Sequence, residues 1–473
     1  MSHLRRAVGV LILSFAAGAA LLVWFGMAAN NPSDLTHSRS GVLWGFWHVL
    51  YNAAPPSANV LVTALGAAGL LAAGVAWLDY RILLSTRRSP SRGSMPLVPK
   101  TVMAVTRSVF AGHVSVTVLI PAHNEEARIG RTLEALRQQS TPARRVILVA
   151  DNCVDGTVAI ARAAGVEVIE TVGNRDKKAG ALNQVLRSLL VGQGHNDLVM
   201  VLDADTVLAP EFLEAAARRF AEDRALMAVG GLFYGEDGSG MLGQLQRNEY
   251  TRYARDIGRR NGRLFVLTGT ASMFRSMALR TVAERRGSTL PGRHGDVYDT
   301  AALTEDNELT LALKSLGALM VSPPQCRAVT EVMATWRGLW VQRLRRLRGA
   351  LENLGAYGLT RQTLRYWAQQ LGIGYGVIAF AMYAAFMVVM AFTVRPWVWY
   401  PFWLGVGVLL ITERVVTVWS GGWRARLLAA LLIPELLYTV FFYGVYVTGV
   451  LHMAMDRRAY GDLGDHAVVE EPC

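Results

Sequence analysis

Two acids spaced one residue apart end an apolar segment in the middle of the chain. Asp203 and Asp205 directly follow Leu198-Val-Met-Val-Leu. In an open α/β sheet the ligand crevice lies outside the carboxyl ends of the strands, so both carboxylates would lie at its mouth. Alternate positions of an extended chain point to the same side, which lets both acids share one Mg²⁺ or Mn²⁺ with substrate phosphates. The alternative is a strand that runs into a solvated turn.

Short apolar segments elsewhere would position these acids at one edge of a sheet. The segment 116–120 stops at Pro121, and a helical pattern begins at Asn124-Glu125-Glu126. Similar segments at 146–150, 166–169 and 198–202 alternate with further helical patterns, one of which opens at Gly156-Thr157. This alternation predicts an α/β fold with βαβ units and a parallel sheet covered on both faces.

Polar motifs follow these segments in a particular order. The motifs are Pro121-Ala-His-Asn124-Glu125, Asp151-Asn-Cys-Val-Asp155-Gly-Thr, Lys178-Ala-Gly-Ala-Leu-Asn183, Asp203-Ala-Asp205 and Thr304-Glu305-Asp306. In this order they resemble the membrane-embedded family 2 glycosyltransferases, which include the cellulose, chitin, hyaluronan and poly-N-acetylglucosamine synthases. The resemblance covers about 116–349 and extends to the flanking apolar segments. It implies a cytoplasmic GT-A (Rossmann-like) catalytic domain inserted between transmembrane helices.

The resemblance implies a nucleotide-sugar donor whose diphosphate is neutralised by a metal ion as it leaves. Asp205, assisted by Asp203, would hold this Mg or Mn ion. Lys178 matches a family lysine near the nucleotide or its phosphates, and it falls in an expected polar loop at 174–180. A solvated lysine is the alternative for Lys178.

The nucleotide itself would bind at two neighbouring strand ends. Glu125 and Asp151 resemble the family contacts to the base and ribose, with Pro121 and Ala122 beside them. Carboxylates can accept hydrogen bonds from uracil N–H and sugar hydroxyl groups. The alternatives are a first-turn helix charge for Glu125 and a turn former for Asp151.

A later motif would supply the catalytic base. The resemblance makes Asp306, with Glu305 beside it, the group that removes the acceptor proton while the diphosphate leaves from the opposite face. Thr304 could instead be only an amino-terminal helix cap. Gly269 and Thr270 resemble residues that line the acceptor site, although a buried strand of small residues has the same pattern.

A basic helical pattern departs from the family. Processive members carry Q-x-x-R-W, and this chain keeps Gln342 and Arg345 but has Arg346 where the Trp belongs. Gln342 and Arg345 share one helical face and can both meet a diphosphate. A basic amphipathic helix on the inner leaflet is the alternative, and both readings can hold. Because the family Trp offers an aromatic face to the acceptor sugar, Arg346 leaves polymerisation and single transfer both open.

The whole chain is more apolar than an ordinary soluble enzyme. Of its 473 residues, 52% are hydrophobic and 18% charged, with apolar blocks near both ends. Many Arg residues flank these blocks, so positive-inside topology explains the net charge of +12 better than nucleic-acid binding does. Cys153, Cys326 and Cys473 have no metal-type spacing and imply no disulfide framework, which fits a reducing compartment.

Apolar blocks long enough to span a bilayer divide the chain. The expected parts are two transmembrane helices and a linker in 1–97, the cytoplasmic catalytic domain in 98–335, interfacial helices with the Q-x-x-R motif in 336–370, about three transmembrane helices in 371–456 and a polar tail in 457–473. The first two blocks are 7–29 and about 58–77. The first could instead be a cleaved signal peptide.

The side of the membrane that holds the tail stays open. About five crossings would place it outside, whereas Arg457 and Arg458 favour the inside. Pro434-Glu435 predicts a break in the last apolar block, and Glu435 should face protein or a polar passage. A re-entrant or interfacial segment near Pro434 would reconcile the two topologies.

These patterns predict an inverting, metal-dependent glycosyltransferase of the cell membrane. UDP-N-acetylglucosamine is the leading donor and a growing saccharide the leading acceptor, while translocation of the product is implied by the resemblance alone. One alternative is transfer of a single sugar to a lipid such as a polyprenyl phosphate or diacylglycerol. Another is a non-catalytic scaffold or transporter, against which the retention of Asp203, Asp205 and Asp306 argues. The lipid bilayer is an expected partner, nucleic acid is not, and an accessory subunit is undecided.

Overall fold

The computed structural model describes residues 40–43, 47–50, 95–107, 113–260, 262–393 and 401–455. The chain divides into two compact units, one of Leu84–Thr363 with Ala459–Cys473 and one of Met1–Leu83 with Leu364–Arg458. The apolar blocks predicted at 7–29 and about 58–77, and the predicted tail at 457–473, lie outside the described residues.

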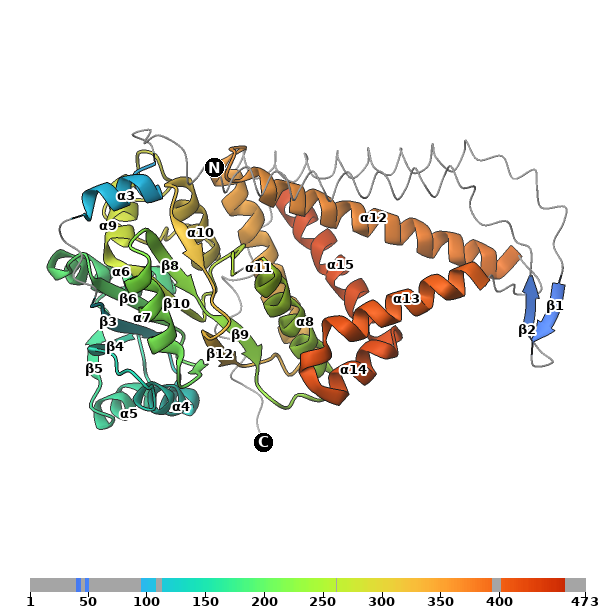
Figure 1. Ribbon diagram of the computed structural model, residues 1–473, viewed down its shortest axis with the longest axis horizontal. Helices are drawn as coiled ribbons and strands as arrows, with labels where there is room; N and C mark the ends of the chain where they lie inside the picture. Colours follow the sequence, from blue (N-terminus) through green and yellow to red (C-terminus); the bar gives the residue numbers. More distant parts are fainter. Residues whose placement is uncertain are drawn as a thin grey trace. The chain divides into compact units, whose positions relative to one another are not determined.

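A seven-stranded sheet forms the centre of the first unit, in the order β11-β8-β10-β6-β3-β4-β5 (Figure 1). Its strands are β3 (Ser115–Ala122), β4 (Arg145–Ala150), β5 (Glu167–Glu170), β6 (Asp197–Leu202), β8 (Leu226–Gly230), β10 (Ala271–Arg275) and β11 (Leu319–Val321). β6, β3, β4 and β5 pair in parallel. The predicted α/β core and its first strands are confirmed.

The sheet is mixed, whereas a parallel sheet was predicted. β10 runs antiparallel to both β6 and β8, and β11 is parallel to β8. A buried strand shows the same run of apolar residues in either direction, so the pattern of 271–275 carries no information on orientation. The direction of β10 is set by how the intervening chain returns to the sheet.

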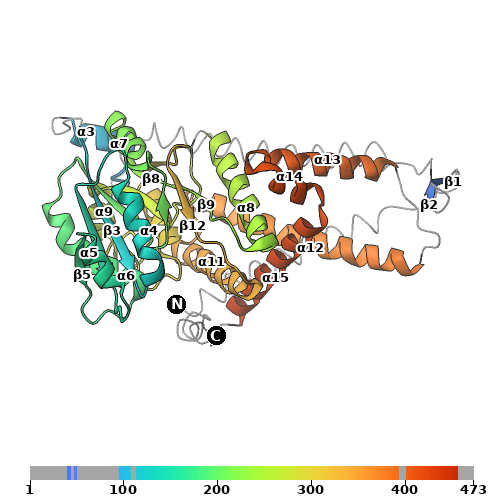
Figure 2. The ribbon, with the colours of Figure 1, turned by 90° about the horizontal axis from the view of Figure 1, so that it is seen from below.

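Helices cover both faces of the sheet, as predicted (Figure 2). One face packs against α3 (Pro99–Val105), α6 (Lys177–Leu189), α9 (Ser276–Arg285) and α10 (Glu305–Ser315). The other packs against α4 (Glu126–Arg137), α5 (Thr157–Ala163) and α7 (Phe212–Glu222). Alternate β6 side chains enter the two cores, Val199 and Val201 the first and Leu198 and Met200 the second. Burial on both faces holds the strand ends in register.

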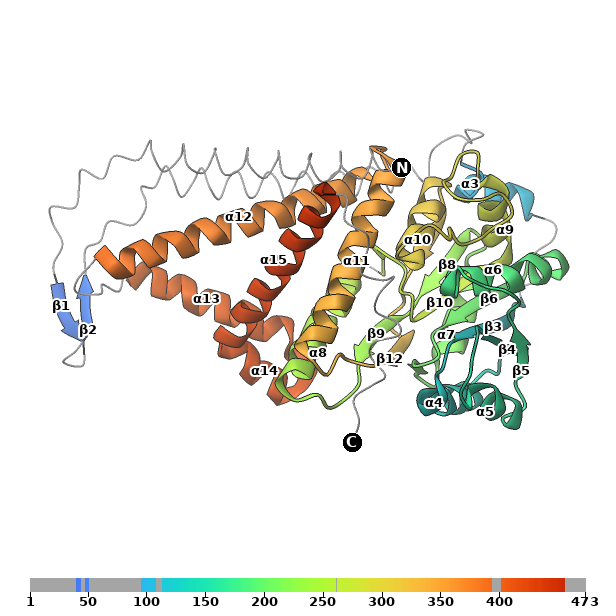
Figure 3. The same cartoon turned by 180° about the vertical axis from the view of Figure 1, so that it is seen from behind.

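A three-stranded sheet and two long helices complete the unit. The sheet has the order β7-β12-β9, with β7 (Val207–Leu208), β9 (Leu232–Gly235) and β12 (Arg327–Thr330). α8 (Gly240–Arg259) follows β9, and α11 (Trp336–Tyr357) follows β12 (Figure 3). Arg343 Nη2 on α11 lies 2.8 Å from Glu249 Oε2 on α8. α11 belongs to the same compact unit as the sheet, and its predicted interfacial position stays a prediction.

The second unit contains the carboxyl-terminal helices and an amino-terminal hairpin. These elements are β1 (Ser40–Leu43), β2 (Trp47–Leu50), α12 (Leu364–Thr393), α13 (Pro401–Thr417), α14 (Gly422–Ala430) and α15 (Ile433–Ala454). By length and apolar composition, two of the described helices could cross a membrane, at Leu364–Val388 and Ile433–Ala454. The total of about five spans stays a prediction.

The last predicted apolar block is broken near Pro434, as its sequence indicated. α14 ends at Ala430 and α15 starts at Ile433, with Pro434 in its first turn. Glu435 is buried, and its Oε2 lies 3.6 Å from Arg414 Nη1 on α13. Glu435 therefore faces protein, as expected for an acid in an apolar helix.

Candidate active site

The carboxyl ends of three parallel strands bring the predicted donor residues to one edge of the sheet. Glu125 follows β3, Asp151 follows β4, and Asp203 and Asp205 follow β6. The amide N of Asp203 donates to Thr270 O at 2.9 Å. This bond joins the segment before β10 to the same edge, so predicted donor and acceptor residues meet here.

The Asp155-Gly-Thr157 motif holds the turn between β3 and α4. Asp155 Oδ2 accepts from Glu126 N at 3.0 Å, and Asp155 Oδ1 accepts from Thr157 N at 3.0 Å. Thr157 Oγ1 accepts from Glu125 N at 2.8 Å. These bonds satisfy amides at the start of α4 and fix the backbone of Glu125. This role went unpredicted, although side-chain-to-backbone turns are a local signal of Asp and Thr.

Glu125 is a half-buried acid in negative surroundings. Its Oε2 is buried without a hydrogen-bond partner, and Arg128 Nη1 lies 3.5 Å away. Burial, followed by the charge of Asp205, raises the pKa of Glu125 against the lowering effect of Arg128. Because its contact with Arg128 is long, Oε2 can accept a further hydrogen bond from outside the chain.

Asp151 is buried and organises the loop that follows β5. Its Oδ1 accepts from Thr171 Oγ1 at 2.8 Å, from Asn174 Nδ2 at 2.8 Å and from Asn152 Nδ2 at 3.1 Å. This arrangement agrees with the alternative that Asp151 forms a turn. A contact with the ribose or base stays a prediction.

Pro121 and Ala122 are buried inside β3. Ala122 O accepts from Asp151 N at 2.8 Å, which joins the ends of β3 and β4. Pro121 pairs with Val149 of β4 and lies beyond the part of β3 that pairs with β6, so its missing N–H interrupts no bond to β6. Both residues shape the strand edge on which Glu125 and Asp151 stand.

Lys178 joins two acidic motifs that are far apart in the sequence. Its Nζ lies 2.6 Å from Asp203 Oδ1 and 3.2 Å from Glu305 Oε1. The side chains are 28% exposed for Lys178, 29% for Asp203 and 15% for Glu305. Burial alone would lower the pKa of Lys178, but the two carboxylates outweigh it and raise this pKa. Lys178 lies in the first turn of α6, which corrects the prediction that it falls in a loop.

Asp203 and Asp205 fit a divalent cation as a partial ligand set. Burial, opposed by Lys178 but reinforced by Asp205, raises the pKa of Asp203. Within the described parts of the chain, no cluster of three or more His, Cys, Asp or Glu side chains could hold a metal ion by itself. Mg²⁺ bound to phosphates commonly takes only one or two carboxylates from the protein. The two acids therefore suit an ion whose other positions are filled by phosphate and water.

Glu305 and Asp306 occupy the first turn of α10, but their surroundings drive their pKa values apart. Burial acts on Glu305, yet the charge of Lys178 outweighs it and holds the pKa below its usual value. Burial and the charge of Glu305 raise the pKa of Asp306, against Lys178 and Arg346. Asp306 Oδ1 accepts from Asn307 N at 2.9 Å. Neighbouring acids with diverging pKa values are a common sign of proton transfer.

The predicted acceptor segment lies against the carboxylate of Asp306. A Cβ added at Gly269 would stand 2.9 Å from Asp306 Oδ2, so a larger residue would displace that carboxylate. Thr270 Oγ1 is buried without a hydrogen-bond partner. The structure thus places Gly269 against Asp306, and the acceptor role of Gly269 and Thr270 stays a prediction.

Two tyrosines that were not predicted stand near Asp306. Burial, followed by the charges of Asp256 and Asp306, raises the pKa of Tyr253 to about 12. Burial raises the pKa of Tyr298 as well, against Lys178 and with a smaller contribution from Glu305. Tyr253 comes from α8, and Tyr298 from the loop before α10. No local pattern marks either residue, because its position depends on tertiary packing.

Helix α11 brings the Q-x-x-R residues towards the acids of α10. Gln342 Oε1 is buried without a hydrogen-bond partner, while Arg345 and Arg346 are exposed. The charge of Arg345 helps to lower the pKa of Glu305, and that of Arg346 opposes the rise for Asp306. Arg346, which replaces the family Trp, therefore acts on the predicted base.

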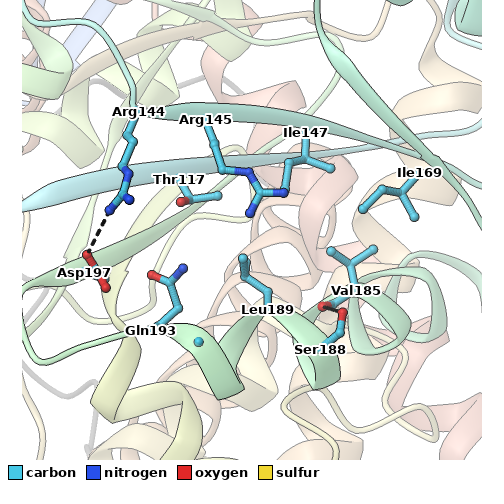
Figure 4. A pocket seen from close by; sticks show the side chains of 11 residues that line it. Thr117, Arg144, Arg145, Ile147, Ile169, Val185, Ser188, Leu189, Gln193 and Asp197 are labelled. Atoms are coloured by element: carbon cyan, nitrogen blue, oxygen red, sulfur yellow. Dashed lines mark hydrogen bonds and ion pairs between the residues drawn. The ribbon is translucent and has the colours of Figure 1, made fainter.

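A separate cavity of about 370 Å³ lies near the amino ends of β3, β4 and β6, where α6 ends (Figure 4). Thr117, Arg144, Arg145, Gln193 and Asp197 contribute to its wall. None of the predicted site residues lines it. The cavity is therefore separate from the acids at the carboxyl ends.

Residues 117–283 match the family model described as glycosyl transferase family 2. Poly-beta-1,6-N-acetyl-D-glucosamine synthases of Staphylococcus epidermidis and Staphylococcus aureus are 26% and 27% identical to this chain over 246 residues, 50% of the chain and 55% of each relative. The chain thus spans about half the length of these curated relatives.

Solved structures of glycosyltransferases were also found. The mannosyltransferase PcManGT from Pyrobaculum calidifontis, in complex with GDP-Man and Mn²⁺, is 18% identical, with 81% of this chain and all 100% of that chain covered and a TM-score of 0.49. Glucosyl-3-phosphoglycerate synthase from Mycobacterium tuberculosis, with Mg²⁺ and UDP, is 17% identical, with 54% of this chain and 83% of that chain covered and a TM-score of 0.35.

Proposed function

We propose, on the premise that residues 117–283 form a glycosyl transferase family 2 domain, that the chain transfers a sugar from a nucleotide sugar to a growing saccharide at a membrane. The observation that carries this proposal is the position of Lys178 Nζ, 2.6 Å from Asp203 Oδ1 and 3.2 Å from Glu305 Oε1. Lys178 joins the acids suited to a metal ion to the turn that carries Asp306. Transfer from a nucleoside diphosphate needs positive charge at the leaving group beside a base for the acceptor.

The proposed donor is a UDP-sugar, with UDP-N-acetylglucosamine as the leading candidate. The names of the Staphylococcus relatives support this sugar. Glu125, whose buried Oε2 has only the ion pair with Arg128 at 3.5 Å, would accept from the base, and Asp151 would contact the ribose.

Positive groups from three elements would surround the diphosphate. Asp203 and Asp205 would hold a Mg or Mn ion, which supplies Lewis-acid neutralisation of the leaving group when bound. Lys178 from α6 would add a second positive charge. Gln342 and Arg345 from α11 would complete the site. The guanidinium group of Arg345 can donate two parallel hydrogen bonds to phosphate oxygens.

In the proposed reaction, the acceptor hydroxyl oxygen forms a bond to the anomeric carbon as the bond from that carbon to the diphosphate oxygen breaks. The hydroxyl proton passes to Asp306, and UDP leaves with the electron pair. Attack opposite the leaving group inverts the anomeric centre. The raised pKa of Asp306 suits a general base, and Glu305 would stay ionised and hold Lys178 in place.

A single transfer to a lipid such as a polyprenyl phosphate or diacylglycerol is the second candidate. It is favoured by Arg346, whose charge acts on Asp306 at the position of the family Trp. A guanidinium group binds phosphate well and offers a sugar no comparable aromatic face. The nature of the acceptor therefore separates the two candidates.

We also propose that the catalytic unit faces the cytoplasm of a cell whose membrane holds the apolar helices. Leu364–Val388 and Ile433–Ala454 have the length and composition for this, and nucleotide sugars are made in the cytoplasm. Passage of a lengthening saccharide between the helices would follow from the family resemblance.

The decisive experiment is turnover by the full chain in membrane vesicles. UDP-N-acetylglucosamine, UDP-glucose, UDP-glucuronate and UDP-galactose are offered in turn with Mg²⁺ or Mn²⁺, and UDP release and product length are followed. Asp306→Asn is the control for the base. Metal-dependent release that this change abolishes, with a ladder of saccharides, supports the synthase.

Other outcomes of the same experiment point elsewhere. One short lipid-linked product would replace the synthase with the single-transfer candidate. Tight UDP binding without turnover of any donor, even with lipid acceptors added, would contradict the enzyme proposal and favour the scaffold or transporter.

A further inference from the structure

We propose that Asn353 of helix α11 is a positioning residue for Asp306, and that it couples the base to the helix carrying Gln342 and Arg345. This inference rests on the proposed function, because only a base needs to be held against an acceptor. Asn353 belongs to none of the sequence motifs described above, and none of the predicted roles includes it. Its contacts with the start of α10 carry the proposal.

Asn353 is a buried polar residue, 3% exposed, whose side-chain amide faces the turn before Asp306. Its Nδ2 donates to Thr304 O at 3.2 Å, to Thr304 Oγ1 at 3.3 Å and to Asn307 Oδ1 at 3.2 Å. These acceptors lie on both sides of Glu305 and Asp306 in the sequence. Because buried polar groups depend on their partners, loss of this amide would free both ends of the catalytic turn.

Thr304 is directed towards α11, and it does not cap α10 with its side chain. It stands at the N-cap position of α10 but makes no side-chain capping hydrogen bond. A Cβ added at Gly349 would lie 2.4 Å from Thr304 Oγ1 and 2.7 Å from Thr304 Cγ2. The absence of a side chain at Gly349 lets Thr304 approach the α11 backbone closely. The alternative of a simple cap is therefore replaced by a contact between helices.

A second contact between α10 and α11 lies one helical turn further along. Glu308 is 2% exposed, and Arg286, the residue after α9, is fully buried. Arg286 Nη1 lies 2.6 Å from Glu308 Oε1, and its Nη2 lies 2.7 Å from Oε2. Tyr357 of α11 donates its hydroxyl to Glu308 Oε1 at 2.5 Å. Asn353 and Tyr357 are four residues apart on α11, so they present one face of the helix to α10. α10 is thus held along its first turns.

The same turn of α10 also fixes the proposed acceptor segment. Thr310 Oγ1 donates to Asp306 O at 2.8 Å and accepts from Leu267 N at 3.0 Å. Gly269, two residues after Leu267, lies against the Asp306 carboxylate. The base therefore has the acceptor segment on one side and α11 on the other.

Helix α11 connects these contacts to the proposed diphosphate site. Arg345 precedes Asn353 by two turns, a rise of about 12 Å along a helix. A helix that bends little transmits a shift at Gln342 or Arg345 to Asn353. The geometry therefore links the seating of the diphosphate to the placement of Asp306 against the acceptor.

The first test measures the catalytic turn without relying on turnover. Asn353→Ala is introduced into the full chain in lipid nanodiscs, and amide hydrogen exchange is followed by mass spectrometry. We expect exchange at residues 304–310 to rise about 10-fold or more, with β3 and β4 unchanged, because local opening determines exchange. Val341→Ala, an exposed change on the same helix, is the matched control. Unchanged exchange at 304–310 would overturn the proposal whether or not the chain is a transferase.

The second test separates positioning from a general loss of structure. With the donor that the wild-type chain uses, Asn353→Ala should lower kcat about 10–100-fold, as expected for a reacting group misplaced by about 1 Å. KM for the donor should change less than about 3-fold, since Glu125 and Asp203 are untouched. If Asn353→Ala raised hydrogen exchange at 304–310 but left kcat unchanged, Asn353 would have only a structural role. This result would overturn the positioning role.

A double-mutant cycle shows whether the effect passes through the observed contact. Asn307→Ala removes one acceptor of the Asn353 amide, and the pair of changes is compared with each alone. Coupled residues give non-additive effects, so the double variant should lose less kcat than the product of the two single losses. Additive losses would contradict the contact. If the wild-type chain turned over none of the donors, the proposed function would be refuted. The hydrogen-exchange experiment would still decide whether Asn353 holds the first turn of α10.

Discussion

The seven-stranded sheet has charged side chains at both ends of its parallel strands. We call the side where these strands begin the amino edge and the side where they end the carboxyl edge, and the two differ in how their charges are paired. At the amino ends, Arg145 Nη2 lies 2.8 Å from Glu167 Oε1, and Arg144 Nη1 lies 4.0 Å from Asp197 Oδ1. These arginines are 45% and 70% exposed. At the carboxyl ends, Asp203 and Glu305 both pair with Lys178. The amino ends have paired, solvated charges, whereas at the carboxyl ends two acids that are less exposed than these arginines share Lys178.

This contrast favours the carboxyl ends of the strands as the proposed site, although the cavity lies at the amino ends. The cavity of about 370 Å³ in Figure 4 lies at the amino edge, where each guanidinium group has an acidic neighbour. The acids Glu125, Asp203 and Asp306 at the other edge have raised pKa values, since burial and neighbouring charges disfavour ionisation. Perturbed groups of this kind are typical of functional sites. A bound cation would offset this negative charge.

The largest effect is expected from removing an acid at the carboxyl edge. Asp205→Ala should lower kcat/KM about 1000-fold or more, because the metal ion that neutralises the leaving group loses a ligand. The measurement is UDP release over a range of Mn²⁺ concentrations. Glu167→Ala removes an acid from the paired, exposed edge and is the control. An Asp205→Ala enzyme with near-normal activity and normal metal dependence would break the comparison.

A smaller effect is expected when the lysine between the acids is replaced. Lys178→Met should lower kcat/KM about 100-fold, because the diphosphate loses a positive charge and the acids lose their shared partner. Lys178 lowers the pKa of Asp203, Glu305 and Asp306, so its loss should move the acidic limb of the rate profile to higher pH. Rates measured from pH 5 to 9 test both effects. Lys177→Met, one residue earlier, is the matched control.

The pH profile of the wild-type enzyme should reflect the raised pKa of Asp306. A base works only when unprotonated, so activity should fall as pH drops through a value above that of an ordinary aspartate. Arg346 favours the charged form of Asp306, so Arg346→Ala should raise this pKa and shift the acidic limb of the rate profile to higher pH, by a modest amount because Arg346 is exposed. Arg337→Ala removes the same charge elsewhere on α11 and should leave the limb in place. If the acidic limb of the pH–rate profile moved to lower pH in Arg346→Ala, this would contradict the assignment of Asp306 as the base.

The smallest effect is expected at the amino edge. Arg145→Ala should change kcat/KM less than about 2-fold and the free energy of unfolding by about 0–1 kcal/mol, because exposed ion pairs contribute little. Turnover and urea unfolding are the measurements. A 10-fold loss of activity with unchanged stability would show that the amino edge takes part in function, and the comparison would fail.

Much of the fold follows from local patterns along the chain. β3, β4, β5 and β6 were predictable because each is a short apolar run between helical patterns, and the two-sided burial of β6 confirms this. Glu125, Asp203, Asp205 and Asp306 were predictable as site candidates because they belong to short motifs at the ends of strands or at the start of a helix. Asp155 and Thr157 were missed as turn formers, although their sequence carries a local signal.

The amino-acid sequence alone determined the α/β class, the order of the motifs and the residue types available to a metal ion, a nucleotide and a base. Periodicity and strand ends are local properties, so they can be read without coordinates. Only the tertiary structure decided that β10 is antiparallel, that Lys178 stands between Asp203 and Glu305, and that Asn353 holds the turn of Asp306. These features join residues far apart in the chain, and their distances depend on how the helices return to the sheet, which no local pattern encodes.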